Sequence, residues 1–301
     1  MQIQYWIKAL RLRTLPLAVA SIGMGSFLAA SRGLFEVSIL IWATLTSICL
    51  QILSNLANDY GDSIHGVDSS ERIGPQRMVQ SGYISASAMK KALFVMTFFS
   101  LACGIMLLKT AFYPNNMTEF WIFFGIGLLA LLAAIAYTNG KRPYGYEGYG
   151  DISVLIFFGY VAVGGTFFLH TKTWDWLVLL PATSSGVLAV GVLNLNNMRD
   201  IESDKAAGKY SIPVRIGYEK ALIYHGLLCR IALICSLLYV VQLPNPQWYQ
   251  YLFAIPIGFL LYRHLRAIGL QPPHKLDSHL KELVFISLLF TIFFGICIIV
   301  Y

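Results

Sequence analysis

Stretches of about 20 mostly apolar residues, the length that a helix needs to cross the hydrocarbon core of a bilayer, recur along the whole chain. Nine such stretches are expected, at residues 14–31, 37–57, 87–108, 120–138, 152–169, 176–196, 218–241, 248–265 and 280–300. Backbone inside lipid must satisfy its own hydrogen bonds, so each stretch is predicted to be a helix. The sequence therefore predicts an all-α polytopic membrane protein with nine transmembrane helices around a central cavity.

No long polar segment is left for a separate soluble domain. Only 12% of the 301 residues are charged, against about 25% in soluble domains. We therefore expect a single membrane-embedded domain over residues 1–301. The spacing of two acidic segments, four spans apart, favours two four-helix halves, roughly 14–138 and 152–265, followed by a final helix at 280–300. The first apolar stretch could also be read as a signal peptide, but the spans that follow favour its retention.

The basic residues predict the orientation of the chain. With nine spans, 18 of the 22 Lys and Arg residues fall on the side of the amino terminus, three fall on the other side, and Arg230 lies within a span. Loops rich in Lys and Arg stay in the cytoplasm. The amino terminus is therefore predicted to be cytoplasmic.

The first acidic segment, NLANDYGDSIHGVD, follows the second span. Asn58 and Asp62 are four residues apart, so they share a helix face. Asp68 comes after two glycines that permit a bend. Carboxylates this close repel one another unless a cation lies among them.

The second acidic segment, NLNNMRDIESDKAAGK, follows the sixth span. Asn196, Asp200 and Asp204 recur every four residues, which puts all three on one face of a continuous helix. Arg199 and Glu202 are then expected to point elsewhere. If the two acidic faces oppose each other across a cytoplasmic cavity, they form oxygen-rich clusters of the kind that Mg²⁺ prefers.

Solvated acidic loops are the alternative interpretation, since most charge clusters are exposed. Both segments, however, begin in the last turn of an apolar helix, where membrane proteins rarely tolerate such groups without a function. Basic residues surround the same mouth: Arg72, Arg77, Lys141, Arg142 and Arg215. Acids and bases together suit a diphosphate, which metal ions bridge to carboxylates and which Lys and Arg contact directly.

A polyprenyl chain explains why a diphosphate would be bound inside a membrane protein. Ionisation of its allylic C–O bond leaves pyrophosphate and a carbocation, which needs aromatic faces and the exclusion of water. A secondary transporter is the competing class, but transporters place ionisable groups near the bilayer midplane. Here the acidic residues fall at the ends of spans, which favours an enzyme.

The chain resembles the UbiA-type superfamily of intramembrane prenyltransferases, and within it the 1,4-dihydroxy-2-naphthoate polyprenyltransferase branch of menaquinone biosynthesis. The stretches that carry the resemblance are RTLPLAVAS (13–21), NDYGDSIHGVDSSERIGPQR (58–77), YTNGKRPYGYEGYGDISVLIFFG (137–159) and LNLNNMRDIESDKAAGK (193–209). The six-residue separation of Asp62 and Asp68 looks like this branch rather than the branch that prenylates 4-hydroxybenzoate.

The resemblance implies transfer of a polyprenyl group from its diphosphate to 1,4-dihydroxy-2-naphthoate, with loss of CO₂ and pyrophosphate, to give demethylmenaquinone or its quinol. Acceptors of the 4-hydroxybenzoate or homogentisate type remain the alternative. The resemblance further implies a bacterial inner membrane with the site facing the cytoplasm, two Mg²⁺ ions bridging the diphosphate, and no nucleic-acid partner. The implied metal ligands are Asn58, Asp62, Asp68, Asn196, Asn197, Asp200 and Asp204.

The remaining implied site residues would contact the two substrates. Arg72, Arg77 and Lys141 would contact the diphosphate, with Tyr137 positioned by the second acidic segment. Asp151, at the start of the fifth span, is a candidate for orienting or deprotonating the acceptor hydroxyl, although a helix N-terminus would favour an acid there in any case. Arg13 could pair with the acceptor carboxylate or act only in membrane orientation.

Overall fold

The computed structural model describes residues 3–65, 74 and 76–299, and in these residues it is built from helices, turns and irregular loops with no strand. The long helices are α2 (Leu15–Ala30), α3 (Val37–Ile64), α4 (Ala86–Phe112), α5 (Met117–Ala136), α8 (Leu179–Arg199), α11 (Tyr218–Val241), α12 (Ala254–Ile268) and α13 (Leu276–Ile299). A composite helix joins α6 (Gly150–Val154), the π-helical segment η2 (Leu155–Gly164) and α7 (Gly165–Thr171). The prediction of an all-α fold is confirmed.

Eight helical runs are long and apolar enough to cross a membrane. They coincide with eight of the nine predicted stretches, the first of them extended by α1 (Ile3–Leu10) and η1 (Leu12–Thr14). The remaining stretch, 248–265, is divided between η4 (Trp248–Tyr251) and α12, which has 15 residues. A helix of that length falls short of the about 20 residues that a span needs, so the count of nine stays a prediction.

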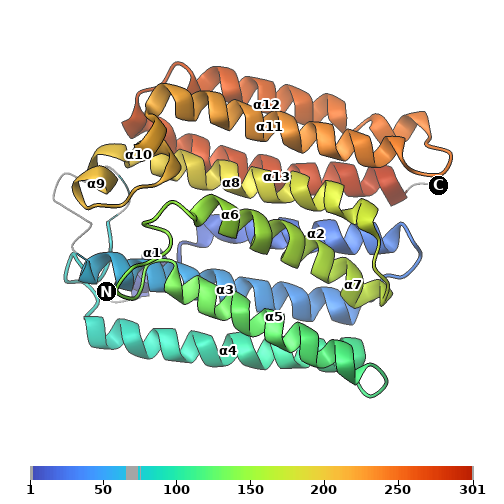
Figure 1. Cartoon of the computed structure of the whole chain (residues 1–301), viewed down its shortest axis with the longest axis horizontal. Helices are drawn as coiled ribbons and strands as arrows, with labels where there is room; N and C mark the ends of the chain where they lie inside the picture. The colour runs from blue at the N-terminus through green and yellow to red at the C-terminus, as the bar shows by residue number, and fades with distance from the viewer. Residues whose placement is uncertain (1–2, 66–73, 75, 300–301) are drawn as a thin grey trace.

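The long helices run side by side along a common axis (Figure 1). Neighbours in sequence pack together, as α3 does with α4, while α13 returns to pack against both α2 and α8. The helix α8 contacts α11, α13 and η2, and most of its residues are buried. At Gly159 a Cβ atom would lie 2.7 Å from the carbonyl oxygen of Ala182, so the glycine permits η2 to approach α8 closely.

Large apolar side chains cover the outside of the bundle, among them Phe94, Phe98, Trp121 and Ile255. Apolar patches of this extent are typical of a surface that faces lipid. The largest buried cluster of apolar side chains lies among α2, η2, α8, α11, α12 and α13. The structure is therefore that of a membrane protein with a packed interior.

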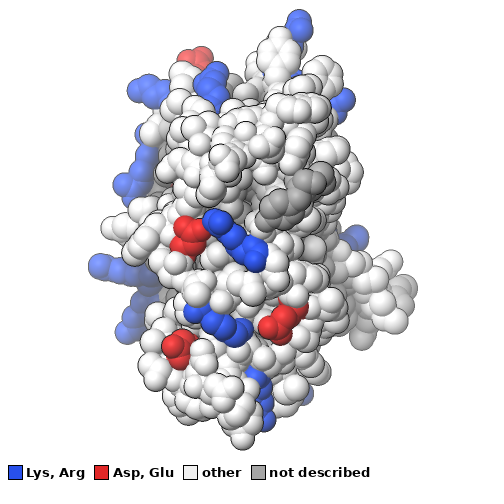
Figure 2. Space-filling view, turned by 90° about the vertical axis from the view of Figure 1, so that its right-hand side faces the viewer, with Lys and Arg blue, Asp and Glu red and all other residues white. Residues whose placement is uncertain are grey.

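The two ends of the bundle differ in their connections. One end, on the left of Figure 1, carries α1, α9 (Ile201–Ala206), α10 (Ile212–Ile216) and the loop 137–149. The opposite end, seen in Figure 2, has shorter connections and few acidic side chains. There Arg32 donates to Asp175 over 2.8 Å and thereby joins the loop after α2 to the loop before η3 (Trp176–Val178) and α8. The richly charged end is the one predicted to face the cytoplasm, and this orientation stays a prediction.

Candidate active site

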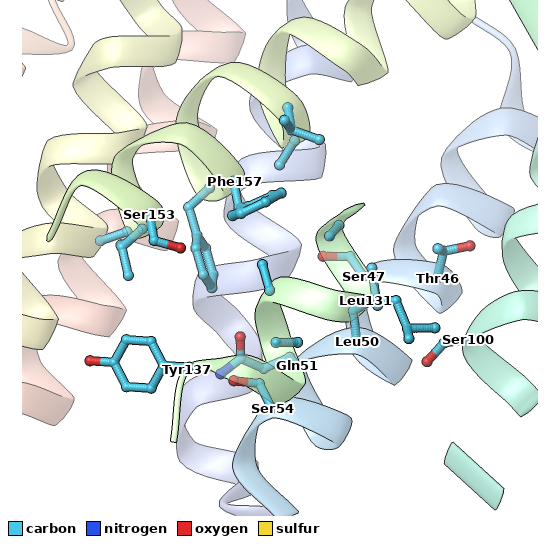
Figure 3. A pocket seen from close by; sticks show the side chains of 18 of the residues that line it. Thr46, Ser47, Leu50, Gln51, Ser54, Ser100, Leu131, Tyr137, Ser153 and Phe157 are labelled. Atoms are coloured by element: carbon cyan, nitrogen blue, oxygen red, sulfur yellow. The ribbon is translucent and has the colours of Figure 1, made fainter. Parts of the chain in front are cut away.

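A cavity of about 560 Å³ lies within the bundle between α2, α3, α4, α5, η2 and α8. Figure 3 shows Tyr137, Phe157 and side chains of α3 from Thr46 to Ser54 around this space. Its charged and amide-bearing wall, near the richly charged end of the bundle, includes Asn58, Asp62, Arg77, Asn196, Asn197 and Lys209. Much of the remaining lining is apolar and includes Leu101, Ile105, Leu108, Phe123, Phe124 and Leu131. The cavity is thus amphipathic along the length of the helices.

Residues 55–64 of the first acidic segment form the end of α3, because the helix continues beyond its apolar part to Ile64. Asp62 is 2% exposed and accepts hydrogen bonds from the Tyr146 hydroxyl at 2.7 Å and from the Arg77 guanidinium. The Asn58 side-chain oxygen accepts from the Thr138 hydroxyl at 3.2 Å. The predicted shared face of Asn58 and Asp62 is therefore present and turned towards the cavity. Asp68 and Arg72 lie outside the described residues.

Asp59 has a different task from its neighbour Asp62. Its two carboxylate oxygens accept the backbone N–H groups of Met78 and Val79 at 2.9 and 3.0 Å. This pair of charge-assisted bonds fixes the backbone directly after Arg77. Asp59 therefore positions the arginine that contacts Asp62.

The second acidic segment departs from the continuous helix that the sequence predicts. Helix α8 ends at Arg199, Asp200 has φ −103° and ψ 17°, and α9 begins at Ile201. The prediction that Arg199 points away from the acids is wrong. Its guanidinium contacts both oxygens of Asp200 at 2.8 and 2.7 Å and the Asn196 side-chain oxygen at 2.8 Å. A buried carboxylate needs a partner of opposite charge, and the break in the helix lets Arg199 supply it.

A third charged partner completes this cluster. Asp277, in the first turn of α13, accepts from Arg199 at 2.7 Å and from Arg13 at 2.6 Å. Arg13 therefore contacts a carboxylate of the protein, although it also lines the cavity. Asp277 could not be predicted as a partner, because it lies 78 residues from Arg199.

Asp204 and Lys209 form a buried ion pair at 3.0 Å beside this cluster. Burial raises the pKa of Asp204, an effect that the Lys209 ammonium partly offsets. Burial by itself would lower the pKa of Lys209, but the charges of Asp204 and Asp62 outweigh it and raise the pKa. The two acidic segments meet at the cavity, which Asp62 lines from the first segment and Asn196 and Asn197 line from the second. Lys209 was missed at the sequence level, where it reads as a loop lysine.

Asn197 supplies an oxygen to the same wall. Its side chain is 2% exposed, lines the cavity, and its carbonyl oxygen has no hydrogen-bond partner among the described residues. A buried polar atom without a partner is unfavourable by about 1–3 kcal/mol. This atom is therefore available to a ligand or an ion in the cavity.

Tyr137 lines the cavity where the loop 137–149 leaves α5, and its ring meets that of Tyr144 edge-on with 5.4 Å between centroids. Gly145 and Gly150 leave room for it, since a Cβ atom at Gly150 would lie 2.9 Å from the Tyr137 hydroxyl. Among the predicted residues, Asp200, Asp204, Asp151 and Lys141 do not line the cavity. Asp151 is buried and accepts from the Tyr224 hydroxyl at 2.8 Å, whereas Lys141 is exposed.

Comparison with known proteins identifies the family of the chain. Residues 17–297 match the model of the UbiA prenyltransferase family. Proteins named 1,4-dihydroxy-2-naphthoate octaprenyltransferase are 43% identical in Haemophilus influenzae, over 98% of this chain and 96% of the relative, and 40% identical in Escherichia coli, over 96% and 94%. A structure of a UbiA homologue from Archaeoglobus fulgidus bound to GPP and Mg²⁺ shares the fold, with a TM-score of 0.65, 17% identity, and coverage of 98% and 99%.

Proposed function

Because the chain belongs to the UbiA prenyltransferase family, we propose that it transfers a polyprenyl group from polyprenyl diphosphate to 1,4-dihydroxy-2-naphthoate. The products are CO₂, pyrophosphate and demethylmenaquinol, which oxidises to demethylmenaquinone. The relatives named for this naphthoate support this acceptor over 4-hydroxybenzoate and homogentisate. Membership of a prenyltransferase family also removes the reason to consider a transporter.

The observation that carries the proposal is the amphipathic cavity. Its acidic, amide-lined wall joins an apolar space that runs along α3 from Asp62 to Ala43, a distance of about 28 Å at the helical rise of 1.5 Å per residue. A diphosphate at the polar end would leave its prenyl tail in the apolar part. Leu101, Ile105 and Leu108 of α4 would contact that tail.

The donor atoms of this site fit Mg²⁺. The first acidic segment brings the Asn58 amide and the Asp62 carboxylate to the cavity, and the second brings the amides of Asn196 and Asn197. The unpartnered Asn197 oxygen is a hard ligand of the kind that Mg²⁺ takes. We propose that Asn58, Asp62, Asp68, Asn196, Asn197, Asp200 and Asp204 hold two ions. Bound Mg²⁺ would neutralise the negative charge that develops on the leaving pyrophosphate.

The residues of the chain have separate roles in this reaction. The diphosphate is bound by Arg77, Lys209 and Arg72, the last of which lies outside the described residues, and their charges stabilise it as the C–O bond breaks. Lys141, an exposed loop residue that does not line the cavity, attracts the diphosphate by its charge. Tyr137 presents its ring to the allylic cation.

The acceptor adds through the ring carbon that carries its carboxylate, a C–C bond forms, and loss of CO₂ restores aromaticity. Asp151 accepts from the Tyr224 hydroxyl and does not line the cavity, so any action on the acceptor hydroxyl would be indirect. Arg13 lines the cavity and attracts the acceptor carboxylate.

The test is prenyl transfer by purified protein with Mg²⁺, a polyprenyl diphosphate and one acceptor at a time, with products identified by mass. We expect the decarboxylated prenyl naphthoquinol from 1,4-dihydroxy-2-naphthoate and no product from 4-hydroxybenzoate. Asp62→Asn and Asp200→Asn should each lower kcat/KM by at least about a hundredfold. Glu202→Gln, an exposed acid on α9, is the matched control and should keep full activity. Product from 4-hydroxybenzoate alone would refute the acceptor, and active aspartate variants would refute the site.

A further inference from the structure

A second cluster of potential metal ligands lies where α12 meets α13, apart from the cavity. It consists of His264, near the end of α12, and of His279 and Glu282 in the first two turns of α13. None of these three residues lines the cavity described above. The reaction proposed for that cavity makes no use of them.

The three side chains converge on one point. Nδ1 of His264 lies 3.1 Å and Nδ1 of His279 lies 3.0 Å from the same carboxylate oxygen, Oε2 of Glu282. One ligand atom from each residue lies within 4.8 Å of the other two. Two imidazole nitrogens and one carboxylate oxygen form a set that Zn²⁺ takes in proteins, with bonds of about 2.0–2.2 Å. The imidazoles distinguish this set from the all-oxygen set of the aspartate site, since imidazole suits Zn²⁺ and its transition-metal neighbours better than Mg²⁺.

The surroundings hold the buried ligand in place. His264 is fully buried, and its second ring nitrogen lies 3.2 Å from Nε2 of His225 on α11, which is buried as well. His225 in turn contacts the Asn194 side-chain nitrogen at 3.5 Å. A partner on the far nitrogen of a histidine fixes the orientation of its ring, as in known metal sites. The other oxygen of Glu282 accepts from Arg263 at 3.2 Å, which leaves Oε2 directed at the two histidines.

The site is open on its other side. The side chain of His279 is 16% exposed and that of Glu282 is 25% exposed, while that of His264 is 0% exposed. An ion can therefore enter from the end of the bundle, and water can complete its coordination. We propose that His264, His279 and Glu282 bind one Zn²⁺-type ion that fastens the short helix α12 to α13.

The test is Zn²⁺ binding to the full-length protein in detergent. The protein is first stripped with a chelator and then titrated with Zn²⁺ against a chromophoric competitor, with excess Mg²⁺ present to compete at the aspartates. His279→Ala and Glu282→Gln change partly exposed side chains, so both should fold, which gel filtration checks. His274→Ala is the matched control, because His274 is exposed at the same end of the chain's last two helices.

We expect the wild type and His274→Ala to bind one Zn²⁺ tightly and both ligand variants to bind it at least about tenfold more weakly, since loss of outer-shell partners alone lowers affinity by about 10–100-fold. Added Zn²⁺ should raise the melting temperature of the wild type and of His274→Ala but not of His279→Ala. Equal Zn²⁺ affinity in the wild type and both ligand variants would refute the site. Such a result would leave the cluster as a set of hydrogen bonds.

Discussion

The loop that carries Tyr137 is held against α3 by a contact that only glycine permits. A Cβ atom at Gly61 would lie 2.5 Å from the backbone oxygen and 2.7 Å from the hydroxyl of Thr138. Thr138 and Asn139 bind α3 there, each donating to the carbonyl oxygen of Ala57 at 3.0 Å. Gly61→Ala would therefore displace the start of the loop 137–149, and with it Tyr137 and the Thr138 bond to Asn58.

The size of the effect follows from this geometry. An ordinary contact of a Cβ atom is at least 3.4 Å, so a 2.5 Å approach requires the loop to move by about 0.9 Å. Overpacking of this kind is unfavourable by about 1–3 kcal/mol, while replacement of glycine by alanine inside a helix is favourable by about 1 kcal/mol. The net loss of stability should be about 1 kcal/mol. A misplacement of about 1 Å near reacting groups can lower a rate by about a hundredfold, so activity should suffer far more than stability.

The assay measures kcat/KM for prenyl transfer and the melting temperature of the same preparation. We expect Gly61→Ala to lose about a hundredfold in kcat/KM and a few degrees in melting temperature. Gly125→Ala, at a helical glycine of α5 with open space around its Cβ position, is the control and should be fully active and slightly more stable. Wild-type kcat/KM in Gly61→Ala would show that catalysis does not depend on the position of this loop.

Three further changes probe the charged wall. Tyr146→Phe removes the 2.7 Å hydrogen bond to Asp62. Because hydrogen bonds to charged groups contribute about 1.5–3 kcal/mol, kcat/KM measured by steady-state kinetics should fall by about tenfold or more. An unchanged kcat/KM would show that this bond is not important for catalysis. Arg199→Lys keeps the charge but loses the planar guanidinium that contacts both oxygens of Asp200, so kcat/KM should fall. An unchanged kcat/KM would show that catalysis does not need this two-point contact. Asp59→Asn leaves one of the backbone N–H groups of Met78 and Val79 without its acceptor and should destabilise the protein by about 1–3 kcal/mol. A melting temperature equal to that of the wild type would contradict the proposed anchoring role of Asp59.

Much of the architecture could be predicted because membrane helices obey strong and local constraints. A run of apolar residues in lipid has to be helical, and eight runs of the chain are helices of spanning length. The approach of the two acidic segments could also be predicted, since both follow spans that end on the same side. The halves at 14–138 and 152–265 stay a prediction, as does the cytoplasmic position of the amino terminus.

The hydrogen bonds and ion pairs of the site could not be predicted, because they join segments that are distant in the sequence. Helical spacing assigned Arg199 to a face away from the acids, but the chain leaves the helix at Asp200 and the arginine turns onto it. Nothing local distinguishes Asp59, which anchors a loop, from Asp62, which faces the cavity. The partners that decide these roles, such as Val79 and Asp277, lie 20 and 78 residues away from the groups they bind.

The two acidic segments share a way of keeping buried carboxylates stable. Arg77 is paired with Asp62, and Arg199 is paired with Asp200, so each half of the site carries its own positive charge. Without such partners a buried carboxylate is unfavourable by several kcal/mol. The same arginines reduce the attraction of the protein alone for divalent cations, because the negative charge of the aspartates is already balanced. A diphosphate restores the negative charge and gives Arg77 a second anion to contact. In the proposed reaction, the balance of charge on these four side chains would therefore favour joint binding of metal and diphosphate over binding of the metal alone.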